Sequence, residues 1–285
     1  MHIRLDNVSY MYKEHTPFAT PALQGINLYI PEGEFVVVVG HSGSGKSTLA
    51  QVISGLLSPQ EGIVTVDGKK ANKDEIFYQV GLVFQYPEQQ FFADTVKEEV
   101  GFAAKNKGLS QEKVDKIIID VLQKVGLDPS SFLERSPFAL SGGEKRKVAL
   151  ASILAMEPQI FIFDEPTAGL DEKGRAWIMD LIRAEHRAGK TVIWISHSME
   201  EAAALAQRVV VMNKGSIVLD GKPQEVFADE EKLFAIGLEL TPAADLLRRL
   251  KKRNFPVLAH GLTIEEAFAE IRAVLWPESD DDDSK

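Results

Sequence analysis

Four short runs of the sequence are apolar almost throughout and lack the alternation of a half-buried strand. They are Phe35–Val39, Ile160–Phe163, Thr191–Ile195 and Val209–Met212. Strands of this kind have both faces buried, as in a mostly parallel sheet that helices cover on both sides. We therefore expect an α/β fold, with Gly81–Phe84 as a fifth strand of the same sheet.

Helical periodicity fills the segments between these strands. The predicted helices of the core are Lys46–Leu57, Lys173–Ala188 and Met199–Ala206. Residues 95–156 contain helical patterns and no convincing strand, so we expect them to form a helical insertion. Weak alternation in the first 35 residues and in Ile63–Val66 indicates antiparallel edge strands.

The pattern changes after Gly221. Short amphipathic helices are predicted at Pro223–Ala228, Glu230–Ala235, Pro242–Arg253 and Ile264–Leu275. We expect a main domain at residues 1–225, with a helical subdomain at about 86–158, and a C-terminal helical extension at 226–278. The extension is too small to fold well alone. The tail at 279–285 contains four consecutive aspartates, and we expect it to be solvated and disordered.

Composition excludes several classes of protein. The chain has 32 basic and 42 acidic residues, a net charge of −10, so its surface would repel nucleic acid and we expect no such partner. No apolar run approaches the roughly 18 residues of a spanning helix, and the first residues lack the apolar core of a secretory signal. There is no cysteine, which excludes disulfides and thiolate metal sites.

The segment Gly40–Thr48 reads GHSGSGKST and matches the phosphate-binding pattern G-x-x-x-x-G-K-[ST]. It follows a predicted strand and precedes a predicted helix, which is the context that the pattern requires. Its glycines allow backbone N–H groups to face a phosphate, Lys46 can reach the β and γ oxygens, and Ser47 can bind Mg²⁺. The predicted nucleotide contacts are Gly40, Ser42, Gly43, Ser44, Gly45, Lys46, Ser47 and Thr48.

Two acids, Asp164 and Glu165, follow the strand Ile160–Phe163. Ligands of a parallel sheet lie beyond the carboxyl ends of its strands, so Asp164 is placed to hold Mg²⁺ near the phosphates. Adjacent residues of an extended chain point to opposite sides, which would direct Glu165 at a water as general base. Alone, the pair could be a solvated acidic turn, but the phosphate loop favours the catalytic interpretation.

A second candidate anion-binding element is Leu140–Glu144, which reads LSGGE and opens a predicted helix. Followed by Asp164–Asp171, which reads DEPTAGLD, it resembles the signature, Walker B and D-loop order of the ABC-type ATPases. The resemblance covers roughly residues 1–225. It implies a P-loop NTPase (RecA-like) core with an antiparallel β subdomain and an inserted α-helical subdomain.

The resemblance also assigns roles to residues that would be weak candidates alone. Gln85 resembles the Q-loop glutamine, with a metal and water role, and His197 resembles the switch histidine that contacts the γ-phosphate. Tyr12 resembles the aromatic residue that stacks on adenine, although Tyr10 lies on the same face.

In the ABC family two ATPase domains pair head to tail. The resemblance therefore implies that the signature of one subunit meets the nucleotide of the other. The residues concerned are Ser141, Gly142, Gly143 and Asp171.

The segment Gln85–Val100 narrows the resemblance further. It is similar to the glutamine-rich helix after the Q-loop in ATPases of energy-coupling factor (ECF) transporters, the cobalt, nickel and vitamin uptake group. Glu134–Glu144 and Leu154–Pro158 resemble the same subgroup. The implied activity is hydrolysis of ATP with Mg²⁺ by a peripheral protein on the cytoplasmic face of the cell membrane.

The same resemblance implies three partners. One is a second ATPase, a copy of this chain or a paralogue, contacted by the C-terminal extension. Another is a transmembrane coupling subunit that docks near Gln89–Glu99, where Glu98 and Glu99 could meet an arginine. The third is a substrate-binding membrane protein.

Other functions fit the sequence less well. An ATPase of another ABC importer remains an alternative. A soluble ABC protein of DNA repair would carry a longer insertion, and one acting on the ribosome would carry two cassettes. A P-loop kinase has no use for Leu140–Glu144, and residues 241–275 show no cluster of ligating side chains for a small-molecule sensor.

Overall fold

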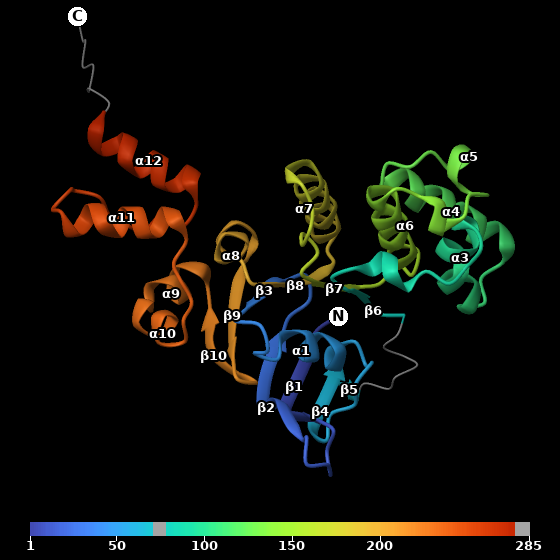
Figure 1. Cartoon of the computed structure of the whole chain (residues 1–285), viewed down its shortest axis with the longest axis horizontal. Coiled ribbons are helices and arrows are strands. Elements are labelled where there is room, and N and C mark those ends of the chain that lie inside the picture. The colour runs from blue at the N-terminus through green and yellow to red at the C-terminus, as the bar shows by residue number, and fades with distance from the viewer. Residues whose placement is uncertain (71–77, 277–285) are drawn as a thin grey trace, which may run out of the picture.

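The computed structural model describes residues 1–70 and 78–276, so the tail expected at 279–285 lies outside the described residues. Its core is a six-stranded sheet in the order β10-β9-β3-β8-β7-β6 (Figure 1). The strands are β3 (Phe35–Val39), β6 (Val80–Val83), β7 (Ile160–Asp164), β8 (Thr191–Ser196), β9 (Arg208–Asn213) and β10 (Ser216–Gly221). Neighbouring strands from β9 to β6 pair in parallel, which confirms the five predicted strands.

Burial on both faces explains why the core strands are apolar without alternation. Every residue of β3 is buried. Val37 and Val39 belong to one apolar cluster, whereas Val36 and Val38 belong to another. The two clusters lie on opposite faces of the sheet because successive side chains of a strand point to opposite sides.

The N-terminal strands form a sheet of their own, in the order β2-β1-β4-β5. They are β1 (Ile3–Tyr12), β2 (Thr20–Ile30), β4 (Glu61–Val66) and β5 (Lys69–Lys70). This antiparallel sheet confirms the predicted antiparallel strands and the β subdomain that the resemblance implied. The antiparallel edge strand of the core sheet is β10, whose burial alternates and whose sequence gives no strong apolar signal.

Helices cover both faces of the core sheet. The helix α1 (Lys46–Ile53) lies on the side of the antiparallel sheet, and α7 (Glu172–Arg187) and α8 (Met199–Leu205) lie on the other side (Figure 1). The apolar cluster beneath α1 includes Leu49 and Ile53 together with residues of both sheets. Packing against α1 thus joins the two sheets.

The predicted helical insertion is present between β6 and β7. Its helices are η1 (Pro87–Gln90), α3 (Val96–Asn106), α4 (Gln111–Lys124), α5 (Pro129–Phe132), η2 (Pro137–Ala139) and α6 (Gly142–Leu154). The expected glutamine-rich helix after Gln85 was wrong as a single element. A short 3₁₀ helix is followed by an extended segment, and α3 begins only after Thr95, whose side chain accepts a hydrogen bond from Glu98 N.

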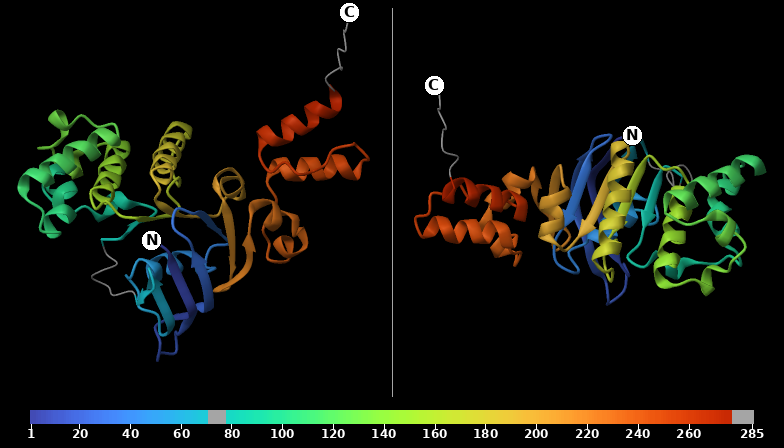
Figure 2. Two further views of the ribbon diagram at one scale, coloured as in Figure 1. Left: turned by 180° about the vertical axis from the view of Figure 1, so that it is seen from behind. Right: turned by 90° about the horizontal axis from the view of Figure 1, so that it is seen from above.

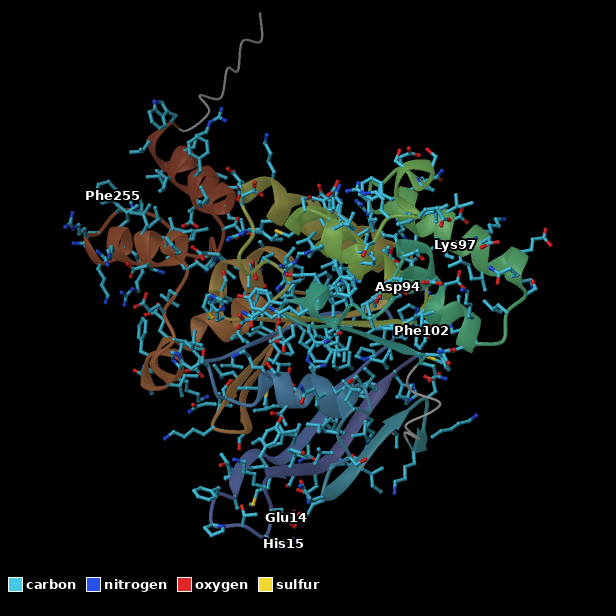
Figure 3. The ribbon with its side chains drawn as sticks, turned by 45° about the vertical axis from the view of Figure 1, so that its right-hand side comes forward. Glu14, His15, Asp94, Lys97, Phe102 and Phe255 are labelled. Atoms are coloured by element: carbon cyan, nitrogen blue, oxygen red, sulfur yellow. The ribbon has the colours of Figure 1, made fainter. Side chains whose placement is uncertain are left out.

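The C-terminal helices lie at the opposite end of the molecule from the helical insertion (Figure 2). They are α9 (Pro223–Ala228), α10 (Glu230–Ala235), α11 (Pro242–Lys252) and α12 (Ile264–Leu275). Residues of α9 and α10 join the main apolar cluster, whereas α11 and α12 have a small cluster of their own, built on Leu247 and Ala267. Figure 3 shows Phe255 at this end and Asp94, Lys97 and Phe102 on the insertion.

Among the helices of residues 1–70 and 78–276, none has the length and apolar character needed to cross a bilayer. The segment after α10 also reaches the phosphate loop, since a Cβ at Gly237 would lie 3.0 Å from His41 Nε2. The segment between α10 and α11 therefore lies against the loop that precedes α1.

Candidate active site

The predicted site residues come together at the carboxyl ends of four adjacent strands. The sheet order places β3, β8, β7 and β6 side by side and in parallel. Gly40 follows β3, His197 follows β8, and Asp164 ends β7. Gln85 lies two residues beyond β6. The parallel register therefore assembles the site that the strand ends predict.

The phosphate loop between β3 and α1 depends on glycine at two close approaches of the backbone. Gly40 has φ +151°, and a Cβ there would lie 2.2 Å from Met212 O. Gly45 has φ +104°, and a Cβ there would lie 2.4 Å from Ala22 O. Any larger residue would push the loop away from β9 or β2, so both glycines fix where the loop lies.

Lys46 folds back over the phosphate loop. Its side chain is buried, and Nζ donates hydrogen bonds to Gly40 O at 2.7 Å and His41 O at 2.9 Å. Burial lowers the pKa of Lys46, while the nearby carboxylates of Glu165 and Asp164 act to raise it. The ammonium group thus lies between the loop and the two acids.

Asp164 is buried at the end of β7, next to the first turn of α1. Burial raises the pKa of Asp164, and a hydrogen bond from the Ser47 hydroxyl partly opposes this effect. Among the described residues, no group of three or more His, Cys, Asp or Glu side chains could hold a metal ion by itself. Ser47 and Asp164 therefore offer two oxygen donors to a cation that draws its other ligands from elsewhere.

Glu165 lies between the other two predicted catalytic residues, Gln85 and His197. Its carboxylate accepts a hydrogen bond from Gln85 Nε2 at 3.1 Å and lies 3.2 Å from His197 Nδ1. The extended backbone expected at Glu165 was wrong, because the strand ends at Asp164 and Glu165 has φ +49°. This left-handed turn, and not the alternation of a strand, aims the carboxylate between Gln85 and His197.

Tyr12 lies beside the phosphate loop at the end of β1. Its hydroxyl is 3.2 Å from Thr48 Oγ1 in α1, and its ring is half-exposed. Tyr10, the alternative aromatic residue, contacts Tyr12 edge to face and packs against the apolar cluster. Tyr12 is thus the tyrosine of the two that has a free face near the loop.

The signature residues lie apart from the phosphate loop, in the helical insertion (Figures 1 and 2). Ser141 caps α6, since its hydroxyl accepts from Glu144 N, and the Glu144 carboxylate accepts from Ser141 N. Gly142 and Gly143 are exposed, with no atom within 4 Å of where a Cβ would stand. Asp171 is also exposed and caps α7.

Arg146 is a site residue that the sequence analysis missed. It is buried in α6, and its guanidinium donates to Gln85 O at 3.1 Å, to Pro166 O and to Ala168 O at 3.3 Å. Burial lowers the pKa of Arg146. A basic residue four positions before the buried Leu150 of the same helix was the available signal, because a buried arginine needs partners.

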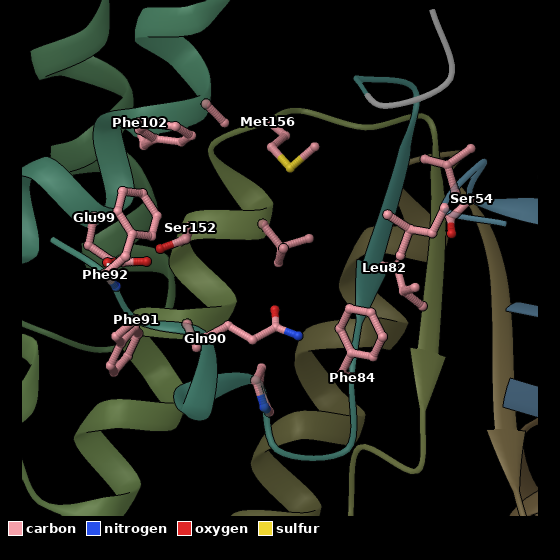
Figure 4. A pocket seen from close by; sticks show the side chains of 16 residues that line it. Ser54, Leu82, Phe84, Gln90, Phe91, Phe92, Glu99, Phe102, Ser152 and Met156 are labelled. Carbon is pink, nitrogen blue, oxygen red and sulfur yellow. Dashed lines mark hydrogen bonds between the residues drawn. The ribbon is translucent and has the colours of Figure 1, made fainter. Parts of the chain in front are cut away.

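A groove of about 300 Å³ lies between β6 and the helical insertion, directly beyond Gln85. Phe92 and Phe102 line one side and Leu82 and Phe84 the other (Figure 4). The rings of Phe92 and Phe102 meet edge to face, with their centroids 4.7 Å apart, and both side chains are more than two-fifths exposed. The groove is therefore an open aromatic surface next to the site.

Glu99 lines this groove but is not exposed to meet an arginine, as was expected of both Glu98 and Glu99. The residue is buried, and its Oε2 accepts hydrogen bonds from Phe92 N at 3.1 Å and Ala93 N at 3.0 Å. Its neighbour Glu98 is exposed in the first turn of α3. Glu99 thus fixes the extended segment before α3, and of these two glutamates Glu98 is the exposed one.

We expect Glu99→Ala to lower the free energy of unfolding by about 1–3 kcal/mol, because two backbone N–H groups would lose their acceptor. The exposed Glu98→Ala should change it by less than about 0.5 kcal/mol. Urea denaturation of both variants checks this. Equal stability of the two would contradict the assigned role of Glu99.

Comparison with known proteins shows the family of the chain. Residues 23–168 match the family model described as ABC transporter. The energy-coupling factor transporter ATP-binding protein EcfA2 of Clostridium perfringens is 46% identical over 273 residues, which cover 94% of this chain and 96% of that protein. The protein of the same name from Caldanaerobacter subterraneus is 47% identical, with coverage of 94% and 95%.

Solved structures agree with these relatives. One is cbiO1 from Clostridium perfringens, described as part of the ABC transporter complex cbiONQ, with a TM-score of 0.70, 32% identity and coverage of 88% of this chain and 94% of that one. Another is the ATP-binding cassette MJ0796, a dimer in a post-hydrolysis state bound to ADP and Pi, with a TM-score of 0.69, 33% identity and coverage of 78% and 98%. The chain thus belongs to the ABC transporter family, and within it to the ATP-binding proteins of energy-coupling factor transporters.

Proposed function

We propose that this ATPase binds ATP with Mg²⁺ at Gly40–Thr48 and hydrolyses it with Glu165 as the general base, to energise an ECF-type importer of a vitamin or transition-metal ion. The observation that carries the assignment is the convergence of Gln85 and His197 on the Glu165 carboxylate, beside Lys46. Phosphate release by Glu165→Gln protein is the experiment that tests it.

Each side chain of the site has a separate role in binding or hydrolysing ATP in this proposal. The loop N–H groups and Lys46 hold the β- and γ-phosphates, and the Ser44 hydroxyl, buried without a hydrogen-bond partner in the described part of the chain, is one more group for a ligand to satisfy. Glu165 takes the proton of a water that attacks the γ-phosphorus, while Gln85 holds the carboxylate and water in place. His197, which is largely exposed, contacts the γ-phosphate.

The residues present also suit Mg²⁺. The Ser47 hydroxyl and the Asp164 carboxylate supply two oxygen donors, and Mg²⁺ usually takes its remaining ligands from phosphates and water. Gln85 would add an amide oxygen near the same place. When bound, the ion neutralises charge on the phosphates.

Two subunits would complete each nucleotide site. Ser141, Gly142, Gly143 and Asp171 are exposed, the first three at the start of α6 and Asp171 at the start of α7, which leaves them free to meet the nucleotide of a second ATPase, identical or paralogous. We assign the C-terminal extension, residues 226–278, to the same contact. The exposed apolar side chains of α12 support this assignment, among them Ile264 and Phe268.

We place the transmembrane coupling subunit in the groove beyond Gln85. Its aromatic lining suits an apolar helix, and η1 runs directly from Gln85 into the groove wall. Exposed Gln89, Gln90 and Glu98 offer polar contacts at its edge. A chain docked in this way is a peripheral protein of the cytoplasmic membrane face, and a substrate-binding membrane protein would complete the importer.

We expect Phe92→Arg to prevent co-purification with the transmembrane subunit, because a charge would replace an aromatic contact surface that the partner must desolvate. Phe92 is 59% exposed, so the variant should fold and keep its basal ATPase activity. The matched control is Tyr29→Arg, an aromatic residue 50% exposed on the antiparallel sheet, which should assemble as wild type. Assembly of the Phe92 variant at wild-type yield would move the docking site elsewhere.

A further inference from the structure

A buried carboxylate outside the proposed catalytic set connects two parts of the site. Glu201 lies in α8 and is buried. Its Oε1 accepts a hydrogen bond from Thr167 Oγ1 at 2.7 Å, and its Oε2 accepts from Trp194 Nε1 at 3.0 Å and Ser196 Oγ at 2.6 Å. All three donors are buried as well. The carboxylate is therefore held from three sides without water-exposed partners.

Two of these donors flank the proposed catalytic residues. Thr167 lies two residues after Glu165, and Ser196 directly precedes His197. Glu201 thus accepts a hydrogen bond from each of the two segments that carry the meeting side chains.

The hydrogen bonds also close a ring around the backbone of His197. Ser196 Oγ accepts from Ser198 N at 3.0 Å, and Ser198 Oγ accepts from Glu201 N at 3.2 Å. The residues on both sides of His197 are therefore tied to Glu201. His197 itself is largely exposed, so few packing contacts can fix its ring.

Burying a carboxylate is costly unless hydrogen bonds compensate for the lost water. A fully satisfied buried network does, however, specify one arrangement of the groups it joins. The groups joined here are the segments of Glu165 and His197, whose side chains lie 3.2 Å apart.

We infer that Glu201 is a positioning residue, which sets the relative placement of Glu165 and His197 by holding Thr167 and Ser196 on one carboxylate. The inference rests on the proposed roles of Glu165 and His197. It predicts that the Thr167 and Ser196 hydrogen bonds act as a unit, because losing either one frees one segment from the other.

A double-mutant cycle tests this inference on the full chain. Thr167→Val and Ser196→Ala each remove one hydroxyl and should each lower kcat by about tenfold, since small misplacements of reacting groups cost up to about a hundredfold. The KM for ATP should stay within about twofold, because the phosphate loop is untouched. The double variant should lose no more than either single one, as is typical of residues that act as a unit.

Matched variants separate positioning from general destabilisation. Thr191→Val removes a buried hydroxyl at the opposite end of β8, where Thr191 accepts from Gly33 N at 2.9 Å. It should lower the melting temperature and leave kcat unchanged. Thr167→Ser keeps the hydroxyl and should restore kcat.

Three results would overturn the inference: wild-type kcat in folded Thr167→Val protein, failure of Thr167→Ser to restore kcat, or losses that multiply in the double variant. The proposed function is judged separately, by Glu165→Gln. If that variant is inactive while Thr167→Val is fully active, the positioning role falls and the proposed function stands. Wild-type turnover by Glu165→Gln would remove both.

Discussion

Glu165→Gln protein should bind Mg-ATP nearly as tightly as wild type and hydrolyse it about 10²–10⁴-fold more slowly. The change keeps the shape of the side chain and removes the group that accepts the proton of the attacking water, and loss of a general base costs a factor of this size. Binding should persist because Lys46 and the loop N–H groups are unchanged. Unhydrolysed ATP should then accumulate on the protein.

Phosphate release and equilibrium binding of ATP, measured on the same preparation, check this expectation. Glu172→Gln is the matched control, because Glu172 is an exposed glutamate in the first turn of α7. Its turnover should equal that of wild type. Turnover at the wild-type rate in the Glu165 variant would show that another group takes the proton.

Lys46→Ala should instead weaken ATP binding, by about tenfold to more than a hundredfold. A hydrogen bond to a charged group contributes about 1.5–3 kcal/mol, and each 1.4 kcal/mol is a factor of ten in affinity. The variant would also leave Gly40 O and His41 O without the ammonium that now donates to both.

Titration with a fluorescent ATP analogue measures the affinity, and Lys173→Ala, an exposed lysine of α7, serves as the control. The control should bind as wild type. An unchanged affinity in the Lys46 variant would mean that the phosphates lie elsewhere than over the loop.

The core sheet could be predicted from the sequence because burial on both faces requires apolar residues at every position, as in β3. The antiparallel subdomain was implied by the resemblance to ABC-type ATPases, but the pairing of its strands could not be predicted. The sheet depends on pairing Ile3 with Val66 and Ile3 with Ile30, contacts between distant parts of the chain that no local pattern records. The edge strand β10 was missed for a different reason, since its half-buried residues carry no continuous apolar run.

The site was predictable where its residues follow strand ends or match a motif. Gln85, Asp164 and His197 each follow or end a parallel strand, so the sheet order alone brings them together. The left-handed turn at Glu165 was not predictable, because glutamate rarely adopts it. The hydrogen-bond partners of Arg146 could not be predicted, because they lie on other elements of the fold.

The helical periodicity of the sequence already indicated that Glu99 is buried. Val96, Val100 and Ala103 form the buried stripe of α3, and helical spacing places residue 99 on the same face. Glu98 falls outside that stripe. The periodicity that identified the helix thus also separates a structural glutamate from one that is free to meet a partner.

We propose that ATP held by the phosphate loop is hydrolysed where Gln85, Glu165 and His197 meet. The most direct measurement is the structure of Glu165→Gln protein, in its assembled complex, with Mg-ATP. We expect density for the γ-phosphate beside Lys46, within reach of residue 165 and His197, with the signature serine of the second ATPase subunit on the same nucleotide. A nucleotide bound elsewhere, or one whose γ-phosphate lies out of reach of residue 165, would contradict it.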